Sequence, residues 1–522
     1  MTTPPIPTHG LVASESRESA EAGAALLSAG GNAVDAAVAA AIAETVVSPH
    51  NAGILGFAGA MLVHLAARNE TFAIRFDTLA PKRATPDMFI GKREQHRAGP
   101  LSVGVPGVLR GLEAAVNRFG RRPWAEAVAP AQRLAAEGFP ISALSASMIT
   151  AYRDRLRDFL ETAACLMPDG RAPAAGDWKK SPDLAASLAM IAVQGADAFY
   201  IGELGERTVR HLQAQGGILS REDLAAYTPE IDAPLSMQLD DDQFLTPALP
   251  GGGISVLQSL RVLRHLPPPR QAHPQDDPDY LHHLIQTMKL VWRDRLTHMA
   301  DPAYMTTPPD FFLSDTHAAA LATRILNGDV PDDFVVPADF SCTSHVTASD
   351  AEGNLATVTY THGFAFGSMV TAPGTGLTLG HGMARFDGTP GRPNSVAPGK
   401  KALHNMAPMI VLRRGLPFLA LGWTGGRRIP NVVTQVLANL TRFGLPLQAA
   451  LAAPNLHCEG ADPIKAEPSF PAATLEALRQ RGHRMELLDR VLGFGSAIQW
   501  DPARAAATAA TDPRRNGTVA SV

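Results

Sequence analysis

The sequence predicts a mixed α/β fold in which strands precede and follow a helical middle. Three observations predict it. Short apolar runs flanked by polar residues, typical of strands, occur between residues 61 and 76. A helix-rich middle follows, and strand patterns return after residue 343. Strands on both sides of a helical middle fit two packed sheets covered by helices, because each sheet must bury an apolar face.

The start of the chain contains two helical patterns and one pair of strands. Ser14–Ser28 and Asn32–Val47 carry apolar residues at helical spacing, and Gly30-Gly31 between them is typical of a helix that ends and restarts. Met61–Leu65 and Thr71–Phe76 are short apolar runs that we expect to pair as strands.

The middle of the chain is predicted to be helical and the last third to return to strands. Helical patterns cover Leu109–Arg118, Trp124–Glu137, Leu184–Gln194, Glu206–Gly216 and Tyr280–Met299. Two later strand patterns and one helix cover Met409–Arg413, Pro417–Leu421 and Asn431–Arg442.

A hairpin that begins with a threonine is the most informative feature of the chain. The runs Thr343–Ser349 and Leu355–Thr361 are rich in Val and Thr, and the turn residues between them include Gly353-Asn354. Just upstream, Asp329 to Asp339 is acidic and proline-containing, as expected of an exposed loop. A loop that leads directly into Thr343 is what a self-processing hydrolase needs.

The chemistry of such a hydrolase depends on the new chain end. Cleavage before Thr343 frees an α-amino group beside a side-chain hydroxyl. That amine can act as general base for the hydroxyl, because an α-amino group titrates near pH ~8. Taken alone the pattern is weak, since a threonine at the start of a strand is usually structural.

Composition places few limits on function but excludes some partners. The 522 residues are 45% hydrophobic and 18% charged, with no low-complexity linker, so we expect one large fold cut into two segments. A net charge of −4 gives no reason to expect nucleic acid or an anionic membrane as partner. No stretch reaches the roughly 18 apolar residues of a membrane span.

The chain start and the cysteines indicate a cytoplasmic location. Met1 to Gly10 has no basic start and no apolar run, which argues against a secretory signal. The cysteines, Cys165, Cys342 and Cys458, are odd in number and widely spaced, so they match neither a disulfide framework nor a zinc pattern.

Motifs along nearly the whole chain resemble one known family. They include Ala33-Val34-Asp35-Ala36-Ala37, Ser48-Pro49-His50, Ser102-Val103-Gly104-Val105-Pro106-Gly107, Met288-Lys289, Asp294-Arg295, the hairpin that begins at Thr343, Phe366-Gly367, Met406-Ala407-Pro408 and Gly425-Gly426. Together they resemble the γ-glutamyltransferase family of N-terminal-nucleophile (Ntn) hydrolases.

This resemblance implies an αββα four-layer sandwich built from a precursor that cuts itself. Cleavage at the Cys342–Thr343 bond would leave a large fragment, residues 1–342, and a small fragment, residues 343–522, that stay partners. The mature protein would be an amidohydrolase that forms an acyl-enzyme on Thr343 with a small-molecule amide. It would need no cofactor and no metal.

The same resemblance assigns roles to residues around the nucleophile. Thr361 aligns with a threonine that hydrogen-bonds the nucleophile, and Gly425 and Gly426 align with glycines whose N–H groups form an oxyanion hole. Close backbone approach to an oxyanion is a physical reason for glycine there. Cys342 is a rival nucleophile by chemistry, but the alignment selects Thr343 and leaves Ser344 as a neighbour. His345 is equally consistent with a buried strand histidine and a catalytic one.

The substrate end departs from the family pattern. Glutamyl-specific members hold the substrate with an Arg and an Asp, and the aligned positions here are Asp77 and Arg385, so both charges are inverted. Gly363 replaces an asparagine, and His404 and Asn405 replace two serines. Like charges in a desolvated pocket repel by several kcal/mol, so we expect poor activity on γ-glutamyl compounds.

Several interpretations of this end stay open. Asp77 and Arg385 could pair with each other, a local shift could bring Arg75 into the pocket, or Arg385 could hold a substrate carboxylate. We favour hydrolysis of a non-glutamyl amide with a small carboxylate-bearing, oxamate-like acyl group. The alternatives are a γ-glutamyl hydrolase or transpeptidase acting on glutathione-like compounds, and an unprocessed, non-catalytic binding homologue. The sequence leaves open whether water or an amine accepts the acyl group.

Overall fold

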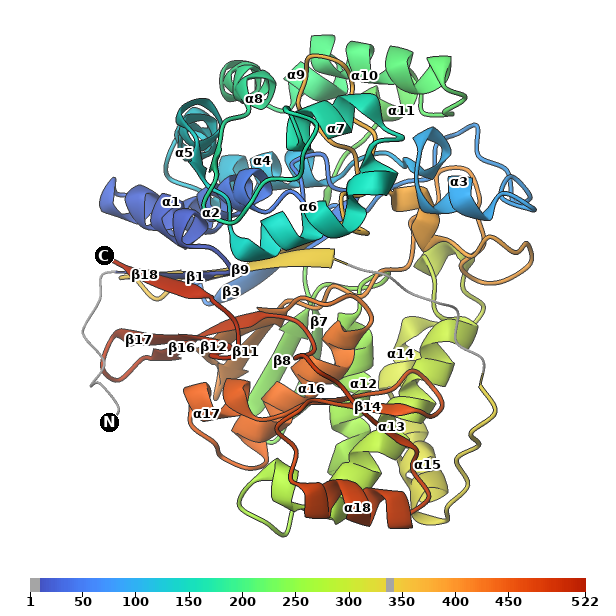
Figure 1. The fold of residues 1–522 in the computed structure, drawn as a ribbon. Helices are drawn as coiled ribbons and strands as arrows, with labels where there is room; N and C mark the ends of the chain where they lie inside the picture. The colour runs from blue at the N-terminus through green and yellow to red at the C-terminus, as the bar shows by residue number, and fades with distance from the viewer. Residues whose placement is uncertain (1–9, 335–341) are drawn as a thin grey trace.

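The computed structural model describes residues 10–334 and 342–522, which form four layers (Figure 1). A seven-stranded sheet lies against a six-stranded sheet, and helices cover the outer face of each. This arrangement confirms the predicted αββα sandwich. Two expectations, on a secretory signal near residues 1–9 and on the loop segment 335–339, concern residues outside those described.

The first sheet carries the predicted hairpin in its middle. Its strands pair antiparallel in the order β18 (Thr518–Ser521), β1 (Gly10–Ser14), β9 (Cys342–Asp350), β10 (Leu355–Gly363), β2 (Ala58–Leu65), β3 (Glu70–Arg75) and β6 (Glu230–Asp232). Neighbours on both sides hold the hairpin in register, and the register of β9 against β10 shifts between Tyr360 and Gly363. Such an irregularity re-aims side chains at a strand end.

The second sheet is also antiparallel and comes mostly from the last third of the chain. Its order is β17 (Ala506–Thr511), β16 (Gly495–Asp501), β12 (Leu416–Trp423), β11 (Met409–Arg413), β8 (Asp242–Thr246) and β7 (Leu235–Leu239). An apolar cluster joins the two sheets and includes Leu62 and Leu355 from the first and Ile410, Ile498 and Trp500 from the second. Interdigitated side chains of this kind form the core between packed sheets.

The burial of helix α2 (Ala33–Val47) accounts for the many alanines in this part of the chain. All fifteen of its residues are buried, between the first sheet and the helices α1 (Arg17–Ser28) and α5 (Trp124–Glu137). Small side chains let the neighbouring elements approach closely. Helix α1 begins at Arg17 rather than at the expected Ser14, because strand β1 extends to Ser14.

Other helices complete the two outer layers. The side of the first sheet carries α4 (Val108–Phe119), α6 (Ala143–Leu156), α7 (Leu160–Leu166), α8 (Pro182–Gln194), α9 (Asp197–Tyr200), α10 (Glu203–Ala214) and α11 (Arg221–Ala225). The side of the second sheet carries α12 (Gly253–Arg264), α13 (Pro278–His298), α14 (Pro309–Leu313), α15 (Asp315–Leu326), α16 (Arg428–Thr441) and α17 (Leu447–Ala452).

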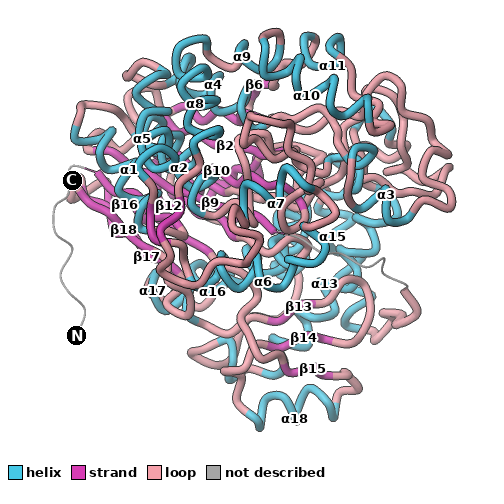
Figure 2. The backbone as a smooth tube through the Cα atoms, turned by 45° about the horizontal axis from the view of Figure 1, so that its top comes forward, coloured by secondary structure: helices cyan, strands magenta, loops and turns pink. Residues whose placement is uncertain are grey.

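Smaller elements lie at the margins of the sandwich. A three-stranded sheet of β13 (Leu456–His457), β14 (Ile464–Ala466) and β15 (Met485–Leu487) projects with α18 (Ala472–Gln480) at one end of the molecule (Figure 2). Helix α3 (Arg93–Arg97) and the short hairpin of β4 (Phe139–Pro140) and β5 (Trp178–Lys179) lie elsewhere. Within residues 10–334 and 342–522 no single helix could span a membrane, although the bent pair Pro182–Gln194 and Asp197–Ala214 passes on length and composition.

Candidate active site

The proposed nucleophile lies near the start of β9, on the face of the first sheet that meets the second sheet. Thr343 is 4% exposed. Alternate residues of a strand share a face, so His345 points the same way. A Cβ on Gly422 of the second sheet would lie only 2.3 Å from His345 Cε1. The Thr343 side chain therefore points toward the second sheet, near the start of strand β9.

The remaining polar residues of this strand have structural surroundings. His345 hydrogen-bonds Thr347 Oγ1 and Thr359 Oγ1, each at 2.9 Å, and burial lowers its pKa to about 3. A neutral, fully bonded ring between two sheets favours the structural interpretation of His345. Burial, with the charge of Glu15, raises the pKa of the Cys342 thiol to about 12. A thiol is a poor nucleophile when it stays protonated, which supports the choice of Thr343.

Thr361 contacts the bond that would be cleaved. Its Oγ1 donates a hydrogen bond to the carbonyl oxygen of Cys342 and accepts one from the Gly363 N–H at 2.7 Å. The sequence predicts a bond from Thr361 to the nucleophile; in the intact chain the hydroxyl donates instead to the carbonyl that precedes it. A donor at this oxygen polarises the carbonyl and stabilises negative charge that develops during attack.

A glycine turn faces the nucleophile from the second sheet. Gly425 and Gly426 connect β12 to α16 and have φ angles of +113° and +65°. L-residues rarely adopt these angles. Neither N–H donates a hydrogen bond within the part of the chain described here. Both N–H groups precede the first turn of α16, whose dipole also favours an anion, as an oxyanion hole requires.

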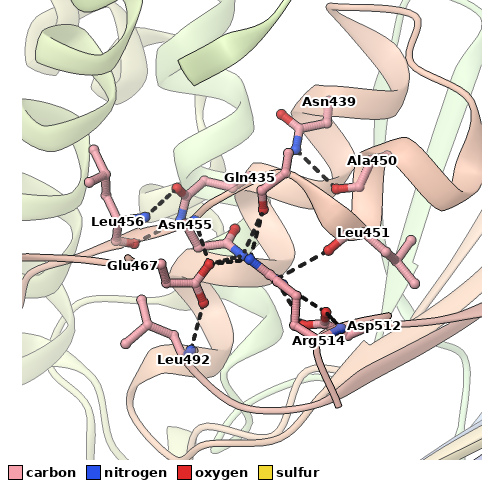
Figure 3. Close-up of polar contacts among 11 residues, drawn as sticks. Gln435, Asn439, Ala450, Leu451, Asn455, Leu456, Glu467, Leu492, Asp512 and Arg514 are labelled. Atoms are coloured by element: carbon pink, nitrogen blue, oxygen red, sulfur yellow. Dashed lines mark hydrogen bonds and ion pairs between the residues drawn. The ribbon is translucent and has the colours of Figure 1, made fainter. Parts of the chain in front are cut away.

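The loop behind this turn is held by a buried ion-pair network. Thr424 and Phe494 exchange two hydrogen bonds, of 2.7 and 2.9 Å. The fully buried Glu467 accepts from the Leu492 N–H at 2.6 Å and pairs with Arg514 at 2.5 Å. Figure 3 shows the contacts of Glu467 with Leu492 and Arg514. The network fixes the backbone against which the glycine turn packs.

Seven residues singled out from the sequence line one small cavity, which we call the nucleophile cavity. It measures about 20 Å³, and its lining comprises Phe57, Thr343, Thr361, Gly363, Arg385, His404, Asn405, Met406, Gly426 and Ile429. This is room for about one water-sized group. Gly425 and Thr343 also line a second cavity of about 1120 Å³, together with Glu15 and Cys342. The two cavities therefore meet at Thr343.

Asp77 has partners other than Arg385. Its Oδ1 lies 2.7 Å from His404 Nε2, and its Oδ2 lies 4.0 Å from Arg75 Nη1. Within residues 10–334 and 342–522, these are the side-chain partners of Asp77, and the considered Asp77–Arg385 ion pair is not formed. His404 lines the nucleophile cavity, whereas Asp77 does not.

Arg75 points toward the sheet edge instead of the nucleophile. Its guanidinium pairs with Glu230 and Asp232 of β6, both at 2.5 Å, and donates to the Leu249 carbonyl at 3.1 Å. Three acceptors hold the side chain there. The structure therefore gives no support to the alternative in which Arg75 enters the substrate pocket.

Arg385 lines the nucleophile cavity and a neighbouring arginine-rich chamber of about 500 Å³. Among the described residues, five arginines and one acidic residue, Asp387, line that chamber, which we call the arginine chamber. They are Arg93, Arg97, Arg385, Arg392 and Arg427. Asp387 is paired with Arg392 at 2.9 Å. Arg97 and Arg427 also have acidic partners, Glu94 at 3.7 Å and Glu459 at 3.0 Å.

Arg295 is a site residue for which sequence analysis predicted no role. It is fully buried in α13 and donates to the carbonyl oxygens of His404 and Gly251 and to Asn405 Oδ1. Burial, with the charges of Arg427 and Arg385, lowers its pKa to about 9. Asn405 Oδ1 accepts from Arg295, and Asn405 also lines the nucleophile cavity, so its amide nitrogen is the group available to donate to a ligand. The only sequence signal that pointed to Arg295 was its place in the motif Asp294-Arg295.

Glu15 was also missed. It lines the larger cavity beside Cys342 and accepts from Asn51 Nδ2 at 3.1 Å. Burial, with the nearby Glu44, holds the pKa of Glu15 well above its usual range. No sequence pattern marks it, because its neighbours come from distant segments. Among the described residues, no three His, Cys, Asp or Glu side chains converge as ligands of a metal ion would.

Comparisons with known proteins agree with this geometry. A model of the gamma-glutamyltranspeptidase family matches residues 19–522. The acylase ACY 1 proenzyme of Pseudomonas sp. (strain SE83) is 34% identical over 518 residues, which cover 95% of this chain and 90% of that protein. The glutathione hydrolase proenzyme of Escherichia coli (strain K12) is 31% identical, covering 95% and 88%. The crystal structure of cephalosporin acylase from Bacillus halodurans superposes with a TM-score of 0.91 at 29% identity, covering 100% and 97%.

Proposed function

This chain belongs to the gamma-glutamyltranspeptidase family of Ntn hydrolases, and from that premise we propose that it hydrolyses a non-glutamyl amide with a carboxylate-bearing acyl group. Its relatives are named proenzymes, which implies processing of one chain into two fragments. We place the cut between Cys342 and Thr343. The fragments are then residues 1–342 and 343–522.

The contacts of the intact chain support this cleavage. Thr343 Oγ1 attacks the Cys342 carbonyl carbon while Thr361 donates to the carbonyl oxygen. The peptide C–N bond breaks as the new C–O bond forms, which moves the acyl group from nitrogen to oxygen. Water then hydrolyses the ester, leaving a carboxylate on Cys342 and a free α-amino group on Thr343.

In turnover the same hydroxyl attacks the substrate amide. The α-amino group of Thr343 takes the hydroxyl proton, and the Gly425 and Gly426 N–H groups stabilise the tetrahedral oxyanion. Collapse expels the amine and leaves an ester on Thr343. Water releases the acid and restores the enzyme.

The observation that carries the substrate proposal is the lining of the nucleophile cavity. Arg385 and the Asn405 amide both lie there with Thr343, whereas no acidic side chain lines it among the described residues. A guanidinium with an amide N–H suits a carboxylate. The ammonium of an L-glutamyl group would instead be repelled by the Arg385 guanidinium. The small cavity of the intact chain also favours a short acyl group.

A γ-glutamyl hydrolase is the second candidate. One relative is named glutathione hydrolase, and the Asp77 carboxylate lies just behind His404. If the His404 ring moved aside, Asp77 could accept a substrate ammonium. This route requires the 2.7 Å contact to break, so we rank it second.

A competition assay with processed enzyme separates the two candidates. Succinyl-p-nitroanilide and butyryl-p-nitroanilide differ only in the terminal carboxylate, and L-γ-glutamyl-p-nitroanilide differs from the succinyl compound by one methylene and the ammonium. Oxamate is tested in parallel through ammonia release. We expect a higher kcat/KM for the succinyl compound than for either other anilide. Preferred turnover of the γ-glutamyl compound would contradict the proposal, and Thr343→Ala supplies the blank.

A further inference from the structure

The buried Asp77–His404 pair sets the hydrogen-bonding character of one wall of the nucleophile cavity. Both residues are at least 95% buried, and Asp77 Oδ1 lies 2.7 Å from His404 Nε2. An ionised carboxylate only accepts hydrogen bonds, so Nε2 must carry the proton of the contact. In the neutral ring the other nitrogen, Nδ1, then has a lone pair and is an acceptor.

His404 Nδ1 has no hydrogen-bond partner within the part of the chain that the structure describes. His404 lines the nucleophile cavity together with Asn405 and Thr343. Its backbone is fixed at both ends, because its N–H donates to Pro250 and its carbonyl accepts from Arg295. A buried polar atom without a partner is unfavourable. An acceptor held this firmly beside the nucleophile is arranged for a donor on the ligand.

The other polar groups of the cavity define which donor fits. Arg385 and the Asn405 amide are both donors, so His404 Nδ1 is the complementary acceptor. An ammonium would be repelled by Arg385, whereas a hydroxyl or a neutral N–H would not. We propose that His404, oriented by Asp77, selects acyl groups that carry a hydroxyl or neutral N–H beside the carboxylate. This inference rests on the proposed function, because Arg385 places the carboxylate.

Matched anilides test the selection. Malyl-p-nitroanilide adds one hydroxyl to succinyl-p-nitroanilide, on the carbon next to the free carboxylate. We expect wild-type enzyme to favour the malyl compound about tenfold in kcat/KM, as for one hydrogen bond to a buried group. His404→Phe should bring this ratio to about one. Asp77→Asn should also lower it, because an amide can either donate or accept and no longer fixes the tautomer.

The two proposals fail in different ways. Equal rates on the succinyl and butyryl compounds would show that the enzyme does not recognise a carboxylate on the acyl group, which would refute the proposed function. A preference for succinyl over butyryl with a malyl-to-succinyl ratio of one in the wild type would overturn only the role of His404.

Ring-nitrogen NMR of the processed enzyme reads the tautomer without turnover. We expect His404 Nδ1 to be unprotonated in the free enzyme and its signal to shift with malate but not with succinate. His64 is the internal control, because it is buried with an unpartnered Nε2 and does not line the nucleophile cavity. A protonated Nδ1, or the same response to both acids, would overturn the inference.

Discussion

The two ends of the proposed active site differ in what positions their residues. The proposed reacting end consists of a strand-end threonine, a second threonine and a glycine turn, all placed by backbone geometry. The proposed acyl-binding end consists of the side chains of Arg385, His404 and Asn405, of which His404 contacts Asp77 and Asn405 contacts Arg295. Backbone geometry tolerates little change. Side chains on loops can be exchanged, so one fold can keep its chemistry and change its substrate.

The largest expected effect is at the nucleophile. Thr343→Ala removes the hydroxyl that both steps need, so we expect a single uncut chain and activity at background. Denaturing electrophoresis with N-terminal sequencing of the small fragment measures it. Ser344→Ala is the matched control, since Ser344 points to the other face of β9. A new N-terminus at residue 343 in the Thr343→Ala variant, or no cut in the wild type, would refute the assignment.

Thr361 tests whether the reacting end includes the donor to the Cys342 carbonyl. Thr361→Ala removes that hydrogen bond, and loss of one donor at a developing oxyanion lowers rates by about 10²–10³. We expect self-cleavage to slow by this factor, followed as the decay of uncut chain after a pulse of expression. Thr361→Ser keeps a hydroxyl and should cleave at nearly the wild-type rate. Equal rates in the Ala and Ser variants would make Thr361 only a packing residue.

Arg385 tests the acyl-binding end alone. Arg385→Ala should lower kcat/KM for succinyl-p-nitroanilide by about 10–100-fold, the value of a charge-assisted hydrogen bond, and leave butyryl-p-nitroanilide unchanged. Arg392→Ala is the control, because Arg392 lines the arginine chamber but not the nucleophile cavity. An equal loss on both anilides would show that Arg385 is structural.

The smallest effect concerns stability and the buried ring of His345. Burial lowers the pKa of His345 from 6.5 to about 3, so between these values the unfolded chain binds a proton that the folded chain does not. The stabilising contribution is complete above pH 6.5. It is lost as pH falls, by about 1.4 kcal/mol per pH unit.

Denaturant titrations at pH 7 and pH 5 check this slope. His345→Gln should reduce the pH dependence of the free energy of unfolding by about 1.4 kcal/mol per unit. A variant of the exposed His273 should keep the wild-type dependence. Identical slopes in the wild type and His345→Gln would show that the ring does not stay neutral in the folded protein.

Much of the reacting end was accessible from the sequence, because its signals are local. The alternation of Val and Thr after residue 343 and the turn at Gly353-Asn354 predicted β9 and β10. Strand β11 and helix α5 were predicted with their observed bounds. Strand β1 was missed, because a strand of only five residues directly before a helical pattern shows little periodicity. The layered arrangement itself came from the family motifs, because periodicity does not say which sheet faces which.

The sequence by itself predicted that a threonine, a second threonine and a glycine pair belong to one site, since family motifs and turn chemistry specify such residues locally. Only the tertiary structure decided the partners of the charged residues. Asp77 meets His404 across 327 positions of the chain, and Asn405 meets Arg295 across 110. No local pattern encodes such contacts. Whether a buried carboxylate meets an arginine or a histidine depends on how the loops pack over the sheet ends.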